Sequence, residues 1–177
     1  GNNANDKDVI LSTDDGSGGK TAYVTLDGSI TKTVFNKPSQ RTFEFSSTTD
    51  GDANGDIVYF GGTTSMTVGT IYHYKSDGTW EAADADAVAT CDGLLAVALG
   101  AASDTNGMLL RGMVTLDHDP GAVGDVLFLS AASTGDATAT APAGNGDIVR
   151  VIGYQVGHAS NGLIWFNPDG TFVEVTA

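Results

Sequence analysis

Residues 69–80 (Gly-Thr-Ile-Tyr-His-Tyr-Lys-Ser-Asp-Gly-Thr-Trp) carry the pattern that decides the fold class. Aromatic and β-branched side chains, which favour strands, lie on both sides of an Asp-Gly pair. That pair favours a tight turn, because glycine adopts a positive φ at little cost. Residues 162–172 (Gly-Leu-Ile-Trp-Phe-Asn-Pro-Asp-Gly-Thr-Phe) repeat the arrangement. Both segments therefore predict a β-hairpin.

Short apolar runs of strand length recur along the rest of the chain. Glycine, aspartate, asparagine or proline stands in nearly every gap, which is typical of a β-sandwich or barrel. We predict strands at Val9–Ser12, Ala22–Leu26, Ser29–Phe35, Thr42–Phe45, Ile57–Phe60, Ile71–Tyr74, Leu94–Leu99, Met108–Leu116, Val126–Leu129, Ile148–Val156, Leu163–Phe166 and Phe172–Val175. Residues 80–90 are rich in alanine but space it with period 2, so we interpret them as a loop or short strand with one helical turn.

The composition also favours an all-β protein. The chain has 22 acidic residues, of which only Glu44, Glu81 and Glu174 are glutamates, and it has 24 glycines. Aspartate and glycine favour turns, whereas glutamate favours helices. A chain of 177 residues can bury about two-thirds of its unfolded surface without a disulfide or structural metal. We predict an antiparallel β-sandwich or barrel-like module with a β-rich N-terminal segment.

The charge is distributed unevenly. Residues 1–50 contain five cations and seven acids, a net charge of −2, whereas residues 51–177 contain three cations and fifteen acids, a net charge of −12. The polar stretch Thr48–Asn54 interrupts the apolar pattern between them. We therefore divide the chain into an attachment or oligomerisation segment at 1–50 and an acidic all-β module at 51–177.

Charge and cysteine content exclude several classes of partner and site. A net charge of −14 repels nucleic acid and anionic membranes, so we expect neither as a partner. No apolar run approaches 18 residues, the length of a transmembrane helix. Cys91 is the only cysteine, which excludes an internal disulfide and a cysteine-based zinc cluster. With Asp92 beside it and no nearby cation in the sequence, we expect its thiol to be unreactive.

Residues 14–21 (Asp-Asp-Gly-Ser-Gly-Gly-Lys-Thr) imitate a phosphate-binding loop. The full motif needs a glycine where Asp14 stands and a helix after the loop, whereas residues 22–26 are predicted as a strand. Asp14 and Asp15 would also repel a phosphate. We interpret the segment as a Gly-rich hairpin loop and expect no nucleotide cofactor.

Residues 50–57 (Asp-Gly-Asp-Ala-Asn-Gly-Asp-Ile) match the start of an EF-hand-type calcium loop. Oxygen donors stand at alternate positions, and a glycine permits the sharp turn. Asp50, Asp52 and Asn54 are therefore the candidate metal ligands. Gly61 occupies the place of the final bidentate glutamate, and a strand is predicted to follow instead of a helix. We expect at most weak calcium binding, and the alternative is a solvated turn.

The other polar residues form no recognisable catalytic set. His73, His118 and His158 are far apart in the sequence and lack the spacing of metal ligands. Asp117 beside His118 resembles half of a catalytic triad, in which an aspartate orients an imidazole. No nucleophile-elbow Gly-x-Ser-x-Gly accompanies it, so we interpret His118 as a turn residue. Close pairs of aspartates, such as 84 and 86, are expected by chance in so acidic a chain. We predict no catalytic and no cofactor-binding residues.

Aromatic side chains provide flat rings on which sugars can stack. The candidates are Tyr23, Tyr59, Tyr72, Tyr74, Trp80 and Trp165. In strands such residues more often belong to a core or an interface. Exposed aromatic rings clustered on one face would favour a carbohydrate-binding module.

Three further segments carry a family resemblance: residues 107–116 (Gly-Met-Leu-Leu-Arg-Gly-Met-Val-Thr-Leu), 124–130 (Gly-Asp-Val-Leu-Phe-Leu-Ser) and 162–175. They resemble a module in structural proteins of tailed bacteriophages, notably tail-fibre proteins of marine and cyanobacterial phages. Residues 21–35, with their Leu-Asp-Gly, are similar to repeated fibre segments in those proteins. The resemblance covers most of residues 20–177. It implies a non-enzymatic, β-rich, homotrimeric virion part and supplies no catalytic residues.

We therefore expect a structural component of a phage virion, either on a tail fibre or as a decoration protein on the capsid surface. Its expected partners are other copies of the chain, as a homotrimer joined through residues 1–50, and other virion proteins. That segment has strand-like runs but few large apolar side chains, and isolated hairpins of this kind need a partner surface. The alternative is a carbohydrate-binding module that recognises a host surface glycan. A polysaccharide depolymerase is a more remote alternative.

Overall fold

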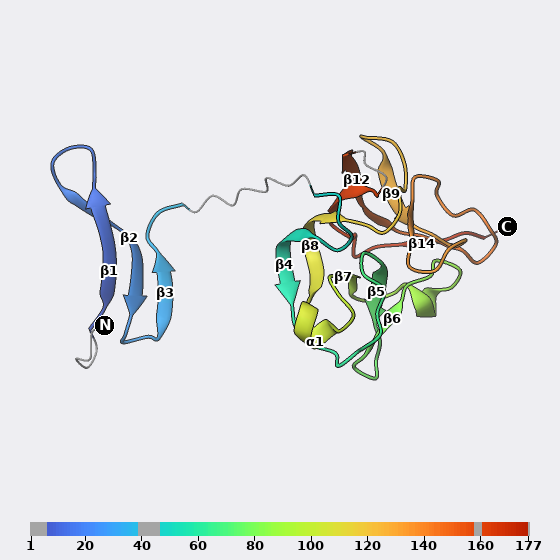
Figure 1. Ribbon diagram of the computed structural model, residues 1–177, viewed down its shortest axis with the longest axis horizontal. Helices are drawn as coiled ribbons and strands as arrows, with labels where there is room; N and C mark the ends of the chain where they lie inside the picture. Colours follow the sequence, from blue (N-terminus) through green and yellow to red (C-terminus); the bar gives the residue numbers. More distant parts are fainter. Residues whose placement is uncertain (1–6, 39–46, 158–160, 177) are drawn as a thin grey trace. The chain divides into compact units, whose positions relative to one another are not determined.

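The computed structural model describes residues 7–38, 47–157 and 161–176, and within them the protein is nearly all β, as predicted (Figure 1). Contacts divide the chain into two compact units, Gly1–Thr42 and Phe43–Ala177. The helices within the described ranges are the single turn α1 (Ser103–Asn106) and the 3₁₀ turn η1 (Val88–Thr90). Neither is long or apolar enough to cross a membrane.

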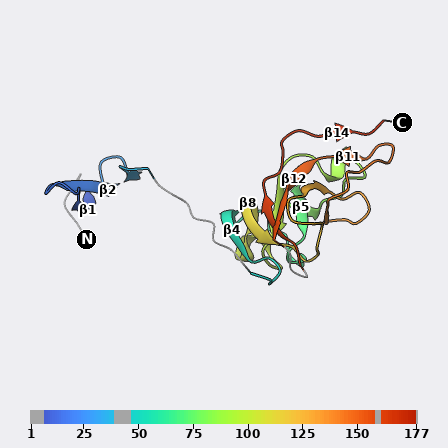
Figure 2. The same cartoon turned by 90° about the horizontal axis from the view of Figure 1, so that it is seen from above.

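The first unit is a three-stranded antiparallel sheet in the order β1–β2–β3 (Figures 1 and 2). Its strands are β1 (Val9–Asp14), β2 (Lys20–Asp27) and β3 (Lys32–Phe35). Every described residue of these strands is exposed or only partly buried. Residues 7–38 form a single layer of strands with no second layer against which to bury a face, so this described part of the unit has no buried core.

The second unit is built on one large antiparallel sheet that curls around its own core (Figure 1). Hydrogen-bonded neighbours follow the order β10–β9–β12–β13–β8–β7–β5–β6, and β4 pairs with β8 off this path. The strands are β4 (Ala53–Val58), β5 (Ile71–Tyr74), β6 (Trp80–Ala82), β7 (Leu95–Ala98), β8 (Met108–Thr115), β9 (Val126–Leu129), β10 (Ala137–Thr138), β12 (Val151–Gly157) and β13 (Leu163–Phe166). A separate two-stranded ladder joins β11 (Ile148–Val149) to β14 (Val173–Glu174).

Strand β8 has three partners and is the point at which the sheet branches. β4 pairs along one edge of β8 from Met108 to Val114. The other edge is divided, because β7 pairs with Met108 and Leu109 whereas β13 pairs with residues 112–115. β7 and β13 can therefore diverge from the same edge and continue the sheet in two directions around the core.

Glycine is required at the branch. Gly55 of β4 and Gly112 of β8 lie directly opposite each other. Gly112 has a φ of +146°, and a Cβ at this position would overlap the carbonyl oxygen of Asn54. The two backbones approach more closely than any side chain would allow, so glycine here has a packing reason.

The core follows from alternation along the strands. Its main cluster contains Ile71, Ala83, Ala85, Cys91, Leu95, Val97, Leu109, Val114, Leu116, Leu127, Leu129, Ala137, Ile148, Ile152, Ile164 and Phe166. A smaller cluster contains Met66, Tyr72, Trp80, Ala96, Ala98 and Met108. Consecutive residues of β5 and β7, and Met108 and Leu109 at the start of β8, belong to different clusters, so these stretches are buried on both faces. This explains why they appear in the sequence as continuous apolar runs.

Of the two predicted Asp-Gly hairpins, the first is confirmed, because β5 and β6 pair in antiparallel register across the turn. The second, at residues 162–172, is wrong, because β14 pairs with β11 and not with β13. Both edges of β13 are already occupied by β12 and β8, so no edge remains for a returning strand. The backbone N–H groups of Asn167 and Asp169 instead donate to carbonyl groups of residues 152 and 151.

Most other predicted strands are confirmed to within a few residues. For residues 80–90, predicted as a loop or a short strand with one helical turn, the structure shows the short strand β6 and the helical turn η1. The strand predicted at Thr42–Phe45 lies outside the described residues. The sequence did not indicate β10 or α1, because neither contains a run of large apolar side chains.

Residues 47–52 belong to the second unit and hydrogen-bond to Thr115 at the end of β8. The Thr115 hydroxyl donates to the Ser47 carbonyl at 2.9 Å, and the Gly51 N–H donates to the Thr115 carbonyl at 2.9 Å. The division between the units therefore lies before the predicted boundary at Thr48–Asn54, and the last residues of the predicted N-terminal segment contact the larger unit.

Arg150 is a buried cation that no sequence pattern singles out. Its guanidinium donates to three backbone carbonyls: Nε to Asp169 at 2.9 Å, Nη2 to Gly93 at 2.8 Å, and Nη1 to Cys91. Burial lowers the pKa of Arg150 below its ordinary value, although an arginine keeps its charge at any physiological pH. The side chain ties two loops to the start of β12.

Candidate functional site

The predicted calcium ligands lie at the entry to β4. The Asp50 carboxylate accepts a hydrogen bond from the Asn161 amide, and Asp52 Oδ2 accepts one from the Ser47 hydroxyl at 2.5 Å. Asn54 lies within β4, which begins at residue 53, inside the motif itself. Asp50 and Gly51 lie in a turn, and a strand follows from Ala53, as predicted, where an EF-hand would continue as a helix. Calcium binding by Asp50, Asp52 and Asn54 stays a prediction.

The segment that imitates a phosphate-binding loop is a hairpin loop between β1 and β2, as predicted. Its own carboxylates bind its backbone. Asp14 Oδ1 accepts from the Gly16 N–H at 2.6 Å, and Asp15 Oδ1 accepts from the N–H groups of Ser17 and Gly19. These backbone hydrogen bonds lower the pKa of Asp15. The amide groups that a phosphate would need are therefore already bound by aspartate.

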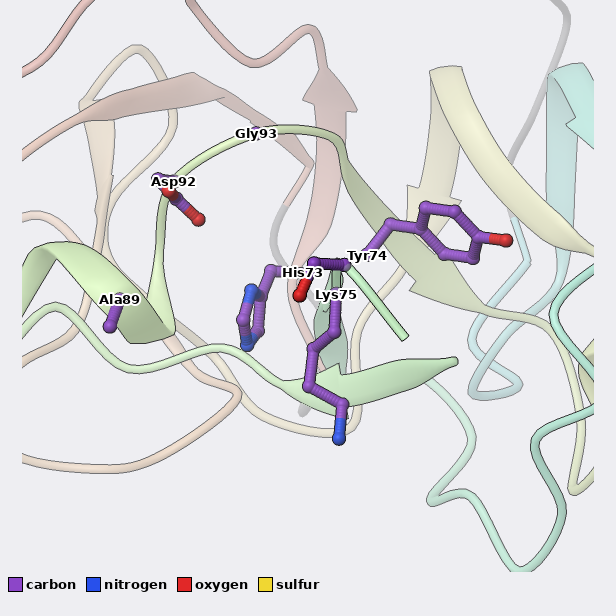
Figure 3. A pocket seen from close by; sticks show the side chains of 7 residues that line it. His73, Tyr74, Lys75, Ala89, Asp92 and Gly93 are labelled. Atoms are coloured by element: carbon purple, nitrogen blue, oxygen red, sulfur yellow. The ribbon is translucent and has the colours of Figure 1, made fainter. Parts of the chain in front are cut away.

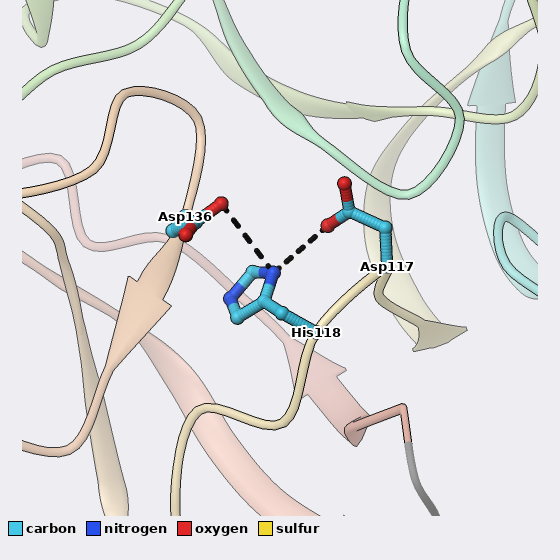
Figure 4. Close-up of side chains that lie close together, drawn as sticks. All are labelled: Asp117, His118 and Asp136. Carbon is cyan, nitrogen blue, oxygen red and sulfur yellow. Dashed lines mark hydrogen bonds and ion pairs between the residues drawn. The ribbon is translucent and has the colours of Figure 1, made fainter.

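The structure brings together three side chains that the sequence did not: Asp117, His118 and Asp136 (Figure 4). Asp117 and His118 follow the end of β8, and Asp136 immediately precedes β10. His118 Nδ1 lies 2.8 Å from Asp117 Oδ1 and 3.5 Å from Asp136 Oδ1. All three side chains are partly buried. We call this group the Asp–His–Asp cluster.

Neighbouring groups fix the orientation of the His118 ring. The Ala137 N–H donates to Nε2 at 2.9 Å, which leaves the proton of a neutral imidazole on Nδ1, where it is donated to Asp117. The Thr70 hydroxyl donates to the other oxygen of Asp117 at 3.1 Å. Asp117 therefore orients the imidazole, as in the half-triad that the sequence suggested. Nε2, the atom that would receive a proton from a nucleophile, is occupied by backbone.

The carboxylate of Asp136 has weaker contacts than that of Asp117, which accepts from both His118 and Thr70. Within the described part of the chain, the partner of the Asp136 carboxylate is His118 Nδ1 at 3.5 Å, which exceeds a normal hydrogen-bond distance. Burial raises the pKa of Asp136, the His118 imidazole opposes that rise, and the negative charge of Asp117 adds to it. Two carboxylates thus face one ring nitrogen that can donate only one proton.

A pocket of about 440 Å³ lies beside β5 (Figure 3). It is lined by His73, Tyr74, Lys75, Ser76, Ala89, Asp92 and Gly93. His73 is only 2% exposed, and among the described residues neither of its ring nitrogens has a hydrogen-bond partner. Glu81 Oε2 approaches Nε2 to 3.5 Å. Because no hydroxyl or thiol of the described chain donates to the ring, the pocket holds no nucleophile–base pair.

Cys91 is buried in the main core cluster. Burial raises the pKa of the Cys91 thiol to about 11, although the charge of Arg150 opposes that rise. The thiol donates to the Ala87 carbonyl at 3.2 Å. At neutral pH the sulfur is therefore a protonated, inaccessible group, and the structural reason is burial together with the neighbouring acidic residues.

The aromatic candidates divide between the core and the surface. Tyr72 and Trp80 are buried, and Tyr74 packs against Phe60 and Trp80 with ring centroids 5.0 and 4.8 Å away. Tyr23 and Tyr59 are exposed. The first group therefore belongs to packing, as such residues most often do in strands.

The outer face of the large sheet carries a row of side chains in register across five strands. From one end to the other, each residue pairs with the next in this order: Val126 of β9, Tyr154 of β12, Trp165 of β13, Met113 of β8 and Asn54 of β4. Tyr154 is 47% exposed. We call these five residues the outer row.

One face of the three-stranded sheet is apolar. Residues directly opposite each other point to the same side of a sheet. The pairs Val9–Leu26 and Leu11–Val24, together with Val24–Phe35, therefore place five apolar side chains on one side. Leu11 is 60% exposed and Phe35 is 64% exposed. We call Val9, Leu11, Val24, Leu26 and Phe35 the apolar sheet face.

No protein-family model matches this chain, and neither a curated protein nor a solved structure matches it.

Proposed function

We propose that this chain is a structural component of a tailed-phage virion whose copies associate through the apolar sheet face of the N-terminal unit. The observation that carries the proposal is that face itself: five apolar side chains aligned on one side of a sheet that residues 7–38 build as a single layer. Contiguous exposed apolar surface of this kind marks an interaction site. The resemblance to phage fibre segments supports the virion as the setting and three as the number of copies.

Charge supports association at this unit and not at the other. Residues 1–42 contain five cations and five acids, a net charge of zero, so the whole net charge of −14 falls on residues 43–177. Copies that meet through the N-terminal unit therefore meet with little repulsion, while the acidic units stay apart in solvent. The same acidic surface keeps an assembled particle soluble.

The apolar sheet face contributes a moderate free energy per copy. Fully burying one Val, Leu or Phe side chain contributes about 1.5–3 kcal/mol. Because these side chains are already partly covered, association recovers about 1 kcal/mol from each, or roughly 5 kcal/mol per copy. Association costs about 4–15 kcal/mol in lost freedom, so contributions from several copies have to combine. Among the described strands of this unit, β1 and β3 are the edges of the sheet, and each offers additional backbone pairing.

A pair of substitutions in β1 tests the association. Leu11→Asp places a charge on the apolar sheet face, whereas Ile10→Asp places the same charge on the opposite face at the neighbouring residue, which is 53% exposed. Sedimentation equilibrium on the full chain should give trimers for the natural sequence and for Ile10→Asp, and monomers for Leu11→Asp. A monomeric natural chain, or equal dissociation by both variants, would refute association through this face; a stable dimer would contradict only the number three.

The setting in a virion needs a separate test. Electron microscopy of a phage particle that carries this chain should place its density on a tail fibre or on the capsid surface. Antibodies against the second unit should label the same position on intact particles, because that unit carries the solvated acidic surface. Labelling confined to disrupted particles would contradict a surface role.

The outer row supports a second candidate function, recognition of a host surface glycan. Sugar-binding sites combine a flat aromatic surface with a few hydrogen-bonding side chains. Tyr154 and Trp165 supply adjacent rings, Asn54 supplies an amide in the same row, and the Arg111 guanidinium lies 5.6 Å from the Trp165 ring.

A glycan array tests this candidate. The natural chain should retain a defined set of oligosaccharides, Tyr154→Ala should lose them, and Tyr59→Ala, which removes an exposed ring away from the outer row, should keep them. Retention that is insensitive to Tyr154→Ala would contradict recognition by the outer row.

A further inference from the structure

We infer that the Asp–His–Asp cluster binds a divalent transition-metal ion of the zinc class through His118 Nδ1 and one carboxylate oxygen each from Asp117 and Asp136. The cluster differs from a surface group of acids because a ring nitrogen stands between the two carboxylates. The three donor atoms lie within 4.8 Å of one another, and none of the three residues is fully exposed. The inference goes beyond the proposed function and does not depend on it.

The spacing of the donors suits a small tetrahedral ion. With metal–ligand distances of about 2.0–2.2 Å, neighbouring donors of a tetrahedral site lie roughly 3.4 Å apart. His118 Nδ1 and Asp136 Oδ1 are already 3.5 Å apart. The 2.8 Å between Nδ1 and Asp117 Oδ1 is a hydrogen-bond distance. It would widen by about half an ångström when the ion replaces the proton on Nδ1.

The surroundings supply the outer contacts that metal sites need. When Nδ1 binds an ion, the ring proton moves to Nε2, which can donate to the Ala137 carbonyl 3.2 Å away. The Thr70 hydroxyl holds the second oxygen of Asp117. Such contacts orient ligands and raise their affinity. The change of tautomer gives up the bond from the Ala137 N–H, so we expect affinity below that of a preformed structural zinc site.

The donor set selects the class of ion. Imidazole nitrogen suits zinc and its neighbours in the first transition series, whereas calcium takes six to eight oxygen donors. Two carboxylates and a neutral imidazole carry two negative charges, which a divalent cation neutralises. Three protein ligands leave the fourth position to water or to an external donor.

The test uses the untagged full chain, zinc chloride, and calcium chloride as the comparison ion. Isothermal titration and thermal denaturation are measured for the natural chain, for Asp136→Asn, and for Glu174→Gln as the matched control. Asp136→Asn keeps the shape of the side chain, whose carboxylate comes no closer than 3.5 Å to His118 Nδ1 among the described residues, so we expect the metal-free variant to fold. Glu174→Gln removes the same charge from an exposed position in β14.

We expect zinc to raise the melting temperature of the natural chain and of Glu174→Gln, and its affinity to fall by at least about tenfold in Asp136→Asn. Absence of a zinc-dependent rise in the natural chain would overturn the inference, as would a rise of equal size in Asp136→Asn. A calcium-dependent rise that matches zinc and is also lost in Asp136→Asn would overturn the assignment to a transition metal. Circular dichroism of each metal-free variant confirms that a loss of binding does not reflect unfolding.

Discussion

Replacing Arg150 by methionine should destabilise the second unit by about 3 kcal/mol. The substitution keeps most of the aliphatic stem and removes all three donors. The Cys91 carbonyl accepts from Arg150 in a fully buried position, whereas Gly93 and Asp169 lie in exposed stretches where water can replace the guanidinium.

The size of the effect follows from these three carbonyls. A buried acceptor left without a partner costs about 1–3 kcal/mol, and each of the other two lost hydrogen bonds costs about 1 kcal/mol. The substitution also removes the free-energy cost of burying the charge of the guanidinium, and this gain offsets part of the sum. The net loss of about 3 kcal/mol corresponds to a fall in melting temperature of roughly 10 °C for a unit of this size.

Urea denaturation and calorimetry measure the effect. Arg111→Met is the matched control, because Arg111 is an exposed arginine of β8 whose contact with the Trp165 ring is worth at most about 1 kcal/mol. Arg150→Lys should lie closer to the methionine variant than to the natural chain, because one ammonium cannot reach three divergent carbonyls. A loss below 1 kcal/mol in Arg150→Met would show that the three hydrogen bonds do not hold the loops together.

Three further outcomes can be checked directly. With a thiol pKa of about 11, roughly one Cys91 in a thousand is ionised at pH 8. Alkylation of the folded chain should therefore be at least about 100-fold slower than that of free cysteine. Rapid labelling would contradict the burial of the thiol. Gly112→Ala should lower the free energy of unfolding by more than about 2 kcal/mol, because the new Cβ would overlap the facing strand and the φ of this residue is +146°. Gly170 has open space around it, so Gly170→Ala should leave the stability nearly unchanged. Equal urea midpoints for the two variants would refute the close approach. If residues 50–54 bind calcium, adding it to the metal-free chain at ten times the dissociation constant should stabilise the chain by about 1.4 kcal/mol, and an unchanged melting temperature would leave a solvated turn.

The strands that the sequence predicts best are those that hydrophobic burial determines locally. Ile71–Tyr74, Val126–Leu129 and Leu163–Phe166 are confirmed to the residue, because each is a short run of mostly apolar and aromatic residues bounded by glycine or polar residues. The partner of each strand is not a local property. β14 was expected to return along β13, but occupied edges on both sides of β13 send it to β11.

The candidate site illustrates the same limit. Asp117 and His118 are adjacent in the sequence, and their interaction could be anticipated from that alone. Asp136 belongs to a different turn, and it reaches His118 only because β9 and β10 pair and bring that turn back to the end of β8. The one available signal was a histidine placed directly after a long apolar strand with aspartate on both sides. Spacing rules for metal ligands within one segment cannot detect donors contributed by separate loops.

The branching of the sheet at β8 also constrains how the chain can be synthesised. β4 precedes β8, and β13 follows it, by about fifty residues each. When β8 leaves the ribosome, β4 is already available to pair with one of its edges. Residues 112–115 on the other edge have no partner until residues 163–166 have been synthesised. Until these emerge, the growing chain displays an open strand edge, which is a template for pairing with other nascent chains. Truncated products that end before residue 163 should therefore aggregate, whereas chains released after residue 166 can close the edge internally.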